Sequence, residues 1–332
     1  MRCPVCLDDS PHAELLRHLD PFGGREYSLR ACRACGAAFS DPMENPGPLW
    51  YARTAAVWAP AEKPAVPAWR LAALRSIRSR RPELTRLLEI GCSDGAFLLE
   101  ARALGFEPHG VDFDGKATAA ARAAGLSGVT TAYFDDFAAV SPGGFGVIAF
   151  FQTLEHLTDP RAFLARVRGL LAPGGLILFD VPDADRPLAA GSGLIDLPPH
   201  HLTRWRRRTV LRLLADAGFE PSDLGSLATY AILRDSVGSW LAARLGALKR
   251  ALSSGRAAPG AAAAGGAAPA APSASPSAAF RAFDLAWRFA LAPLLAPALL
   301  IWLAALKLSG GGFYLRCEAR LRARESGGDN SI

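Results

Sequence analysis

A glycine-rich turn between two apolar stretches carries residues that could bind a nucleoside. Residues 86–90 form an apolar run typical of a buried parallel strand, and the turn that follows contains Gly91, Ser93 and Gly95. Such a turn lets the backbone lie against a ligand beside the N-terminus of the next helix. Asp112 ends the second apolar stretch, where a carboxylate can accept both hydroxyls of a ribose. The spacing therefore predicts a nucleoside cofactor in a doubly wound α/β fold.

Glu89, just before the turn, narrows the choice of nucleoside. The dinucleotide fingerprint G-x-G-x-x-G lacks its third glycine in this register, and a carboxylate here would repel a pyrophosphate. It suits a cationic or zwitterionic ligand instead. These residues resemble motif I of the class I S-adenosylmethionine-dependent methyltransferases, E/D-x-G-x-G-x-G, with Ser93 in place of the middle glycine. For this stretch alone, a glycine turn in another α/β unit is the alternative.

The resemblance extends to about residue 221 through two further segments. Residues 154–160 match L-E-H-x-x-D-P, which follows the fourth strand in many small-molecule O- and C-methyltransferases, and residues 171–175 match L-x-P-G-G before the fifth strand. One departure is Gly146, where the family usually has a mainly structural aspartate. The resemblance implies S-adenosylmethionine as the methyl donor. It also implies the donor-binding residues: Glu89, Gly91, Cys92, Ser93, Gly95, Asp112 for the ribose, Phe113, Phe134, Asp135 and Asp136 for the adenine, and Gln152.

Three histidines are the candidate catalytic residues. His156 follows the fourth apolar strand, at the sheet edge where ligands bind, and could act as the general base or only orient its loop. His200 and His201 fall in the loop where the family places acceptor-binding residues. Adjacent side chains in an extended loop point in opposite directions, so at most one should face the acceptor. Some quinone-ring O-methyltransferases carry a second acid where this chain has Gln152, which argues against a catalytic metal.

Two C-x-x-C pairs near the N-terminus predict a structural metal site. Cys3 and Cys6 are separated from Cys32 and Cys35 by twenty-five residues, and the four thiolates could complete a tetrahedral zinc site. A unit this small cannot bury enough apolar surface to fold alone, so the metal would supply the missing stability. A redox C-x-x-C motif is the weaker alternative, because that chemistry needs one pair rather than two.

The alternation of apolar strands and helices predicts a Rossmann-like, seven-stranded methyltransferase sheet with a small N-terminal zinc ribbon and a hydrophobic helical C-terminal insertion. A third strand is expected over residues 129–134, a fourth over 145–151 and a sixth over 227–233. Before the core, a strand is expected over 26–31 and a helix over 68–80. The expected units are a zinc ribbon (1–41), a linker and lead-in helix (42–85), the donor-binding core (86–235), a helix with an Ala/Gly/Pro-rich linker and an apolar membrane-associated segment (236–308), and a final strand and tail (309–332).

The apolar stretch 289–306 is the unusual feature of the C-terminal part. It holds eighteen uncharged residues, including Pro293 and Pro297, at the lower limit of length for crossing a bilayer. Because a final strand must still rejoin the sheet, a re-entrant or interfacial segment is expected, with 281–308 contacting a membrane surface; packing on the protein itself is the alternative. No secretory signal opens the chain, so a cytoplasmic protein on the inner membrane face is expected.

The expected function is methyl transfer to oxygen or carbon of a small-molecule, sugar or lipid-linked acceptor. An RNA or protein methyltransferase that uses the ribbon for recognition is a second hypothesis, and a non-catalytic scaffold that retains the fold is a third. The net charge of +6 is too mild to indicate nucleic acid, and no N-P-P-Y-like motif follows the fourth strand. Residues 204–208 (R-W-R-R-R) could hold a phosphate or form a solvated helix start.

Overall fold

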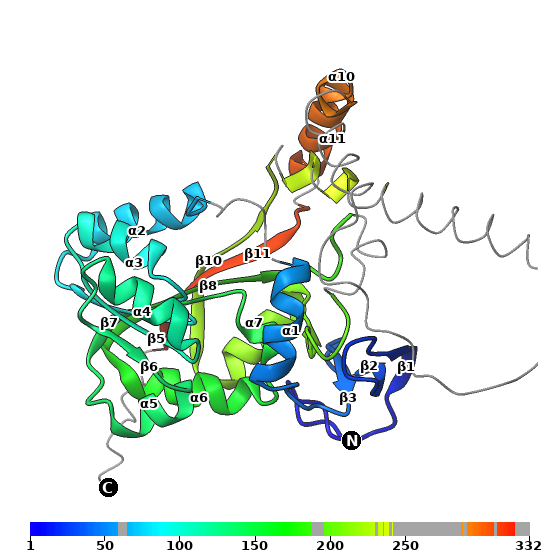
Figure 1. Cartoon of the computed structure of the whole chain (residues 1–332), viewed down its shortest axis with the longest axis horizontal. Helices are drawn as coiled ribbons and strands as arrows, with labels where there is room; N and C mark the ends of the chain where they lie inside the picture. The colour runs from blue at the N-terminus through cyan, green and yellow to red at the C-terminus, as the bar shows by residue number, and fades with distance from the viewer. Residues whose placement is uncertain are drawn as a thin grey trace, which may run out of the picture.

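The computed structural model describes residues 1–58, 65–187, 196–229, 232–234, 236–238, 241, 287, 291–308 and 311–322. Within them, a large mixed sheet forms the centre of the molecule and a smaller sheet lies beside it at the N-terminal end (Figure 1). The Ala/Gly/Pro-rich linker predicted within 236–308 lies outside the described residues.

The large sheet has the strand order β10-β11-β8-β7-β4-β5-β6. Strand β11 is antiparallel to both of its neighbours, and the five strands from β8 to β6 pair in parallel. This confirms the predicted seven-stranded sheet with a late antiparallel strand. The strands are β4 (Arg86–Ile90), β5 (Glu107–Asp112), β6 (Val129–Thr131), β7 (Phe145–Phe151), β8 (Leu171–Pro182), β10 (Phe219–Leu227) and β11 (Tyr314–Leu321).

Helices cover both faces of the sheet because each central strand is apolar on both sides. Leu87 packs with one buried cluster and its neighbour Leu88 with the other, as the two-residue period of a strand requires. The first cluster includes side chains of α2 (Ala68–Arg80), α3 (Ala96–Ala103) and α4 (Gly115–Ala123); the second includes side chains of α5 (Phe134–Val140), α6 (Pro160–Leu170) and α7 (Arg207–Asp216).

The N-terminal unit is a four-stranded antiparallel sheet of order β1-β2-β3-β9. Its fourth strand, β9 (Thr203–Arg204), comes from the loop after β8, so the unit is completed by the large domain. Cys3, Cys35 and Phe39 are buried in the same cluster as the sheet residues of the second face. The remaining elements of the unit are β1 (Ala13–Leu19), β2 (Glu26–Ala31), β3 (Ala38–Asp41) and the following helix α1 (Pro48–Trp58).

Three sequence-based expectations about elements were wrong. The third strand ends at Thr131, because Phe134 already begins α5. The sixth strand is β10, and it ends at Leu227 instead of beginning there, because residues 219–227 pair with β11. The region 42–85 contains a second helix, α1, in a stretch that was expected to be a proline-broken linker.

The apolar C-terminal segment folds as two short helices, α10 (Ala292–Leu294) and α11 (Ala296–Leu308), which project from the edge of the molecule (Figure 1). Leu299 and Leu303 pack against Phe313, which precedes β11. Among the described residues, none of the helices has the length and apolarity needed to cross a membrane.

Candidate active site

A cavity of about 550 Å3 lies where β4, β5 and β7 end, at the sheet edge that carries the glycine turn. Of the predicted site residues, it is lined by Gly91, Asp112, Phe113, Phe134, Gln152, His156 and His200. The other wall residues are Asn45, Pro48, Tyr51, Ile90, Val111, Ala132, Tyr133, Phe151, Thr153, Leu157 and Phe163.

The glycine turn needs its small residues. Gly91 has φ +75°, a conformation that strains other residues, and its backbone lines the cavity. The Ser93 amide donates to Oδ2 of Asp112 at 2.8 Å, and the Asp114 amide donates to Oδ1 at 2.9 Å. Asp112 therefore holds the turn in place while its carboxylate faces the cavity. Cys92, Ser93 and Gly95 shape the turn but do not line the cavity.

Glu89 lies beneath the turn as a buried acid with an unused acceptor. Its Oε2 is buried and has no hydrogen-bond partner among the described residues. Burial raises the pKa of Glu89 well above its ordinary value, opposed by the nearby Arg70 guanidinium and reinforced by Asp112 and Asp94. A buried carboxyl with a free oxygen fits the α-ammonium group of S-adenosylmethionine, and a pyrophosphate would not suit it.

The expected adenine contacts divide between the cavity wall and the surface. Phe113 stacks against Tyr133 with ring centroids 5.8 Å apart, and both rings are about half exposed at the cavity. Phe134 lines the cavity as well. Asp135 and Asp136 do not, because they lie on the exposed first turn of α5, where Asp135 pairs with Arg166 at 3.4 Å. The structure therefore supplies aromatic faces for adenine and places the two predicted carboxylates outside the cavity.

His156 has one ring nitrogen fixed by the backbone. Its Nδ1 lies 2.6 Å from the His200 carbonyl oxygen, which can only accept, so Nδ1 carries the proton. The lone pair is then on Nε2, the form that a general base needs. Burial and the neighbouring rings of His201 and His200 lower the pKa of His156 well below its ordinary value. His156 is therefore a neutral base at neutral pH.

His200 and His201 are stacked, which corrects the expectation that they point in opposite directions. Their rings lie 4.6 Å apart and 18° from parallel, because the chain turns here and is not extended. Only His200 lines the cavity; His201 is buried, and its Nδ1 lies 3.3 Å from Asp196 Oδ1. Ring nitrogens of the three histidines lie within 4.8 Å of one another. The in-plane lone pairs of two near-parallel rings do not converge on one ion, so the arrangement suits a hydrogen-bonded base better than a metal centre.

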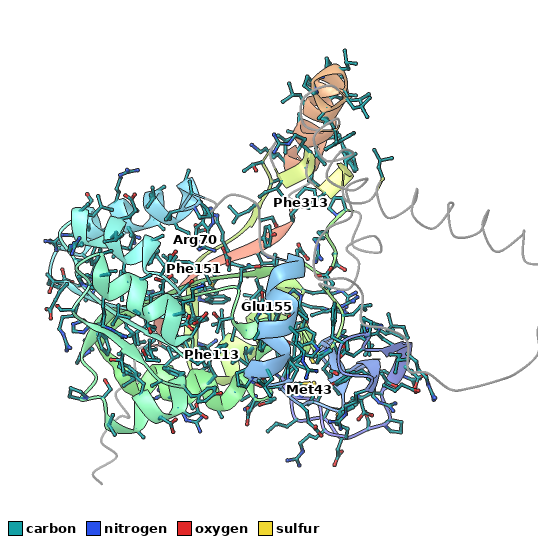
Figure 2. All side chains as sticks on the ribbon, viewed as in Figure 1. Met43, Arg70, Phe113, Phe151, Glu155 and Phe313 are labelled. Carbon is teal, nitrogen blue, oxygen red and sulfur yellow. The ribbon has the colours of Figure 1, made fainter. Side chains whose placement is uncertain are left out.

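A buried polar cluster supports the wall near Gln152. The Gln152 side chain donates to Asp180 Oδ1 at 2.8 Å, and Arg70 Nη2 donates to Asp180 Oδ2 at 2.9 Å. The Arg70 guanidinium also lies 3.8 Å from the centre of the Phe151 ring, beside it in Figure 2. Glu155, labelled in the same view, is buried with neither carboxylate oxygen hydrogen-bonded among the described residues.

Sequence reasoning missed the wall that α1 contributes. Asn45, Pro48 and Tyr51 line the cavity, although the stretch was expected to be a linker. The Tyr51 ring meets His156 and His200 at centroid distances of 6.3 and 6.2 Å, and burial raises the pKa of Tyr51 to about 12. The adjacent aromatic residues Trp50 and Tyr51 were the available signal, but no apolar periodicity accompanied them.

The four predicted metal ligands meet at one point. Cys3 and Cys35 have Sγ atoms 3.6 Å apart, as do Cys6 and Cys32, and all four sulfurs lie within 4.8 Å of one another. A tetrahedral zinc with Zn–S bonds of about 2.3 Å separates its sulfurs by about 3.8 Å, so the cluster fits that ion. The hydrogen bond with Cys35 lowers the pKa of Cys3 to about 5. The two other cysteines, Cys92 and Cys317, are buried with raised pKa values.

The basic cluster 204–208 binds the protein itself. Arg206 donates to the Gly36 carbonyl and pairs with Asp185, and the Arg208 guanidinium fills the space beside Gly36. Arg204 donates to the Asp196 carbonyl, and Trp205 is fully buried. These contacts attach the cysteine unit to α7, while Arg207 and Arg208 are exposed at the start of that helix, as the solvated alternative expected.

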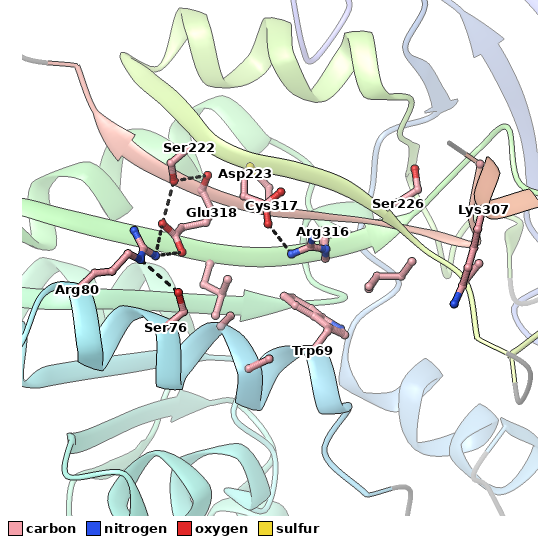
Figure 3. A pocket seen from close by; sticks show the side chains of 16 residues that line it. Trp69, Ser76, Arg80, Ser222, Asp223, Ser226, Lys307, Arg316, Cys317 and Glu318 are labelled. Carbon is pink, nitrogen blue, oxygen red and sulfur yellow. Dashed lines mark hydrogen bonds and ion pairs between the residues drawn. The ribbon is translucent and has the colours of Figure 1, made fainter. Parts of the chain in front are cut away.

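A second cavity, of about 750 Å3, lies between α2 and the β10–β11 pair (Figure 3). Its charged side chains are largely paired with each other: Arg80 with Glu318 and Arg316 with Asp223. It lies over the middle of these strands and away from the glycine turn, so it is not the donor site.

The sheet order and the turn, acid and cavity at its edge define a class I S-adenosylmethionine-dependent methyltransferase. The methyltransferase domain family matches residues 58–223, half of the chain, and the chain belongs to that family.

Relatives with assigned names are similar over part of their length. A ubiquinone biosynthesis O-methyltransferase from Caulobacter sp. (strain K31) is 37% identical over 125 residues, which cover 36% of this chain and 48% of that protein. The enzyme of the same name from Thiobacillus denitrificans is 35% identical over 113 residues, 32% of this chain and 48% of that protein. The chain thus spans about half the length of these curated relatives.

Solved structures are similar at low identity. An S-adenosylmethionine-dependent methyltransferase from Mesorhizobium loti has 17% identity and a TM-score of 0.42, with 75% of this chain and 96% of that chain covered. A proposed sarcosine dimethylglycine methyltransferase from Galdieria sulphuraria has 14% identity and a TM-score of 0.45, with 76% of this chain and 85% of that chain covered. No functional conclusion rests on these likenesses.

Proposed function

We propose that this protein transfers a methyl group to a hydroxyl oxygen of a small, uncharged, planar acceptor, with His156 as the general base. S-adenosylmethionine supplies an electrophilic methyl group on a good leaving group. The observation that carries the proposal is the tautomer of His156, whose Nδ1 is held by the His200 carbonyl while its ring lines the cavity. The O-methyltransferase names of the relatives support the same chemistry.

The cavity wall supports an uncharged acceptor. Among the described residues, no lysine or arginine lines this cavity, and its one carboxylate is Asp112. A phosphate or carboxylate on the acceptor would find no cation there. Tyr51, Phe151 and Phe163 offer aromatic faces to a planar ring. These features support a neutral small molecule as the acceptor over one that carries a phosphate or carboxylate.

In this proposal His156 acts by accepting one proton, that of the acceptor hydroxyl. The neutral ring accepts the hydroxyl proton at Nε2 as the oxygen becomes nucleophilic, and the His200 carbonyl stabilises the imidazolium through Nδ1. Because the pKa of His156 is lowered, the base form persists below pH 6.5. We therefore expect kcat/KM to stay level from pH 8 to about 6.5 and to decline only under more acidic conditions.

The test uses methyl-labelled S-adenosylmethionine with a panel of neutral phenols, matched carboxylated phenols, RNA and protein extract. Label should enter the neutral phenols. His156→Ala should lower kcat by about 10²- to 10⁴-fold, the usual contribution of a positioned base, with an unchanged donor Kd by calorimetry. His109→Ala, which removes a partly buried imidazole paired with Glu107 on β5, is the matched control and should keep full activity.

Three results would contradict the proposal. Label in RNA or protein would support the recognition-module hypothesis. Donor binding without transfer to any pool would support a scaffold. A His156→Ala enzyme as active as the wild type would remove the assigned base.

We further propose zinc as the ion of the Cys3, Cys6, Cys32 and Cys35 cluster, in a structural role. The sulfur spacing and the four-thiolate donor set support it, since such sites leave no open coordination position. His12 lies beside Cys32, within 4.8 Å; both of its ring nitrogens are buried without a hydrogen bond among the described residues, and Nδ1 lies 4.0 Å from Asp8 Oδ2. A ring N–H there could donate to a metal-bound thiolate, as residues around metal ligands commonly do.

We also propose that α10 and α11 contact a membrane surface, on the cytoplasmic face, where an apolar acceptor or a lipid-linked one would be available. Leu294, Ile301 and Leu308 are at least 72% exposed on these helices. Exposed apolar side chains gathered on one projecting element support an interaction surface, and Trp302 beside them suits the bilayer interface.

A further inference from the structure

The N-terminal unit reaches the active site through a buried carboxylate. Asp20 is 2% exposed, and its Oδ2 accepts a hydrogen bond of 2.9 Å from the Trp50 indole N–H. The amides of Phe22 and Gly23 donate to the same carboxylate at 3.0 and 2.8 Å. With three donors around it, this carboxylate is a fixed anchor for the indole ring.

Trp50 connects the Asp20 carboxylate to the loop that carries His200 and His201. Its ring is stacked on His200, with centroids 5.9 Å apart and planes 29° from parallel. The next residue, Tyr51, faces the cavity and meets both His156 and His200. The start of α1 therefore holds His200 from one side and walls the acceptor space with the neighbouring ring.

The same loop is also tied to the cysteine unit by backbone pairing. The Ser40 amide donates to the Leu202 carbonyl at 2.8 Å, and β9 pairs with β3 immediately afterwards. His200 thus lies between a stacked ring and a paired strand, both from the N-terminal unit. Its carbonyl oxygen is the group that fixes Nδ1 of His156.

We propose that Asp20 and Trp50 are positioning residues for the His156–His200 pair, and that the N-terminal unit is one wall of the acceptor site and not a separate recognition module. The inference rests on the proposed function only in naming His156 as the base. It predicts that substitution of Asp20 or Trp50 changes kcat/KM for the acceptor and the Nδ1 hydrogen bond of His156. The donor Kd should stay the same, because Gly91 and Asp112 do not contact these two residues.

The test compares Trp50→Phe, which keeps a ring but loses the N–H donor, with Asp20→Asn, Trp50→Ala and a control, Arg30→Ala. Arg30 lies in the same unit, on β2, where it pairs with Asp41. Trp50→Phe and Asp20→Asn should each lower kcat/KM for the acceptor by about 10-fold, as expected when a reacting group is slightly misplaced, and Trp50→Ala by more. The donor Kd and the control should match the wild type.

A second readout does not depend on turnover. The hydrogen-bonded Nδ1–H of His156 should give a downfield imidazole N–H proton resonance, identified by its absence in His156→Ala, and this should be weakened or lost in Trp50→Phe. If no acceptor is ever found, this resonance still tests the anchor. An unchanged resonance and unchanged kinetics in Trp50→Phe, or a donor Kd that weakens as much as acceptor use, would overturn the inference.

Discussion

Glu89, which is buried, and His156, which is half-buried, have pKa shifts in opposite directions with one main cause. Burial disfavours the charged form, so it raises the pKa of the acid and lowers that of the base. In each group burial therefore favours the neutral form before any ligand arrives. A cationic donor then restores the charge on Glu89, and the acceptor proton charges His156. Glu89 and His156 thus become charged only when a ligand supplies a compensating charge or a proton.

Glu89→Gln tests this at the donor end. Losing a hydrogen bond to a charged group costs about 1.5–3 kcal/mol, so the donor Kd should rise by roughly 10- to 100-fold. Because burial raises the pKa of Glu89, a cation that lowers this pKa should release a proton at any pH between the free and the donor-bound values. Calorimetry in two buffers of different ionisation enthalpy should detect that proton for the wild type and not for Glu89→Gln.

Glu100→Gln is the control, since Glu100 is exposed on α3 and away from the cavity. Equal donor affinity of Glu89→Gln and wild type, with equal proton release, would show that Glu89 only supports the strand.

At the residue scale, the sequence was enough to locate cavity residues that come directly after an apolar strand. Gly91, Asp112 and His156 each follow an apolar strand, and the parallel sheet brings such positions to one edge. The roles of these residues remain predictions. Trp50 and Asp20 could not be found this way, because they are thirty residues apart and meet only through the tertiary fold.

At the scale of elements, strong periodic or apolar patterns located helices and strands well. The helix expected at 68–80 and the strands at 26–31 and 145–151 have those bounds in the structure. The errors fell where local pattern is weak: α1 has no polar face to reveal it, and β10 ends at Leu227, where the apolar stretch 227–233 begins. In β10, pairing with β11 overrides the side-chain pattern.

Helices α10 and α11 offer a prediction of their own. Replacing Leu294, Ile301 and Leu308 together by serine should lower co-sedimentation with liposomes by more than about tenfold, since each buried aliphatic side chain contributes about 1.5–3 kcal/mol. Leu19→Ser, at an exposed position on β1, should bind liposomes as the wild type does. If the wild-type protein does not co-sediment with liposomes of any composition, these helices pack against protein instead.

At the scale of the whole molecule, the cysteine unit and the methyltransferase sheet share one core. Cys3 and Cys35 are buried with the residues under α6 and α7, and Arg161 donates to the Val5 carbonyl at 2.8 Å. Strand β3 of the unit pairs with β9, which directly follows the loop that carries His200 and His201. A metal that orders the unit should therefore influence both stability and activity.

Removing that metal is the test. We expect one zinc per purified chain, and an ion at 1,000 times its Kd adds about 4 kcal/mol to the free energy of unfolding. Cys6→Ser, at a partly exposed ligand, should lose the zinc, lower the unfolding temperature and lower kcat more than it raises the donor Kd, because the histidine loop loses its support while the glycine turn keeps its own. Cys92→Ala should retain the metal, which separates loss of a ligand from loss of a buried thiol. Chains that contain no metal yet unfold at the same temperature with and without a chelator would show that the four thiols hold the unit together unaided.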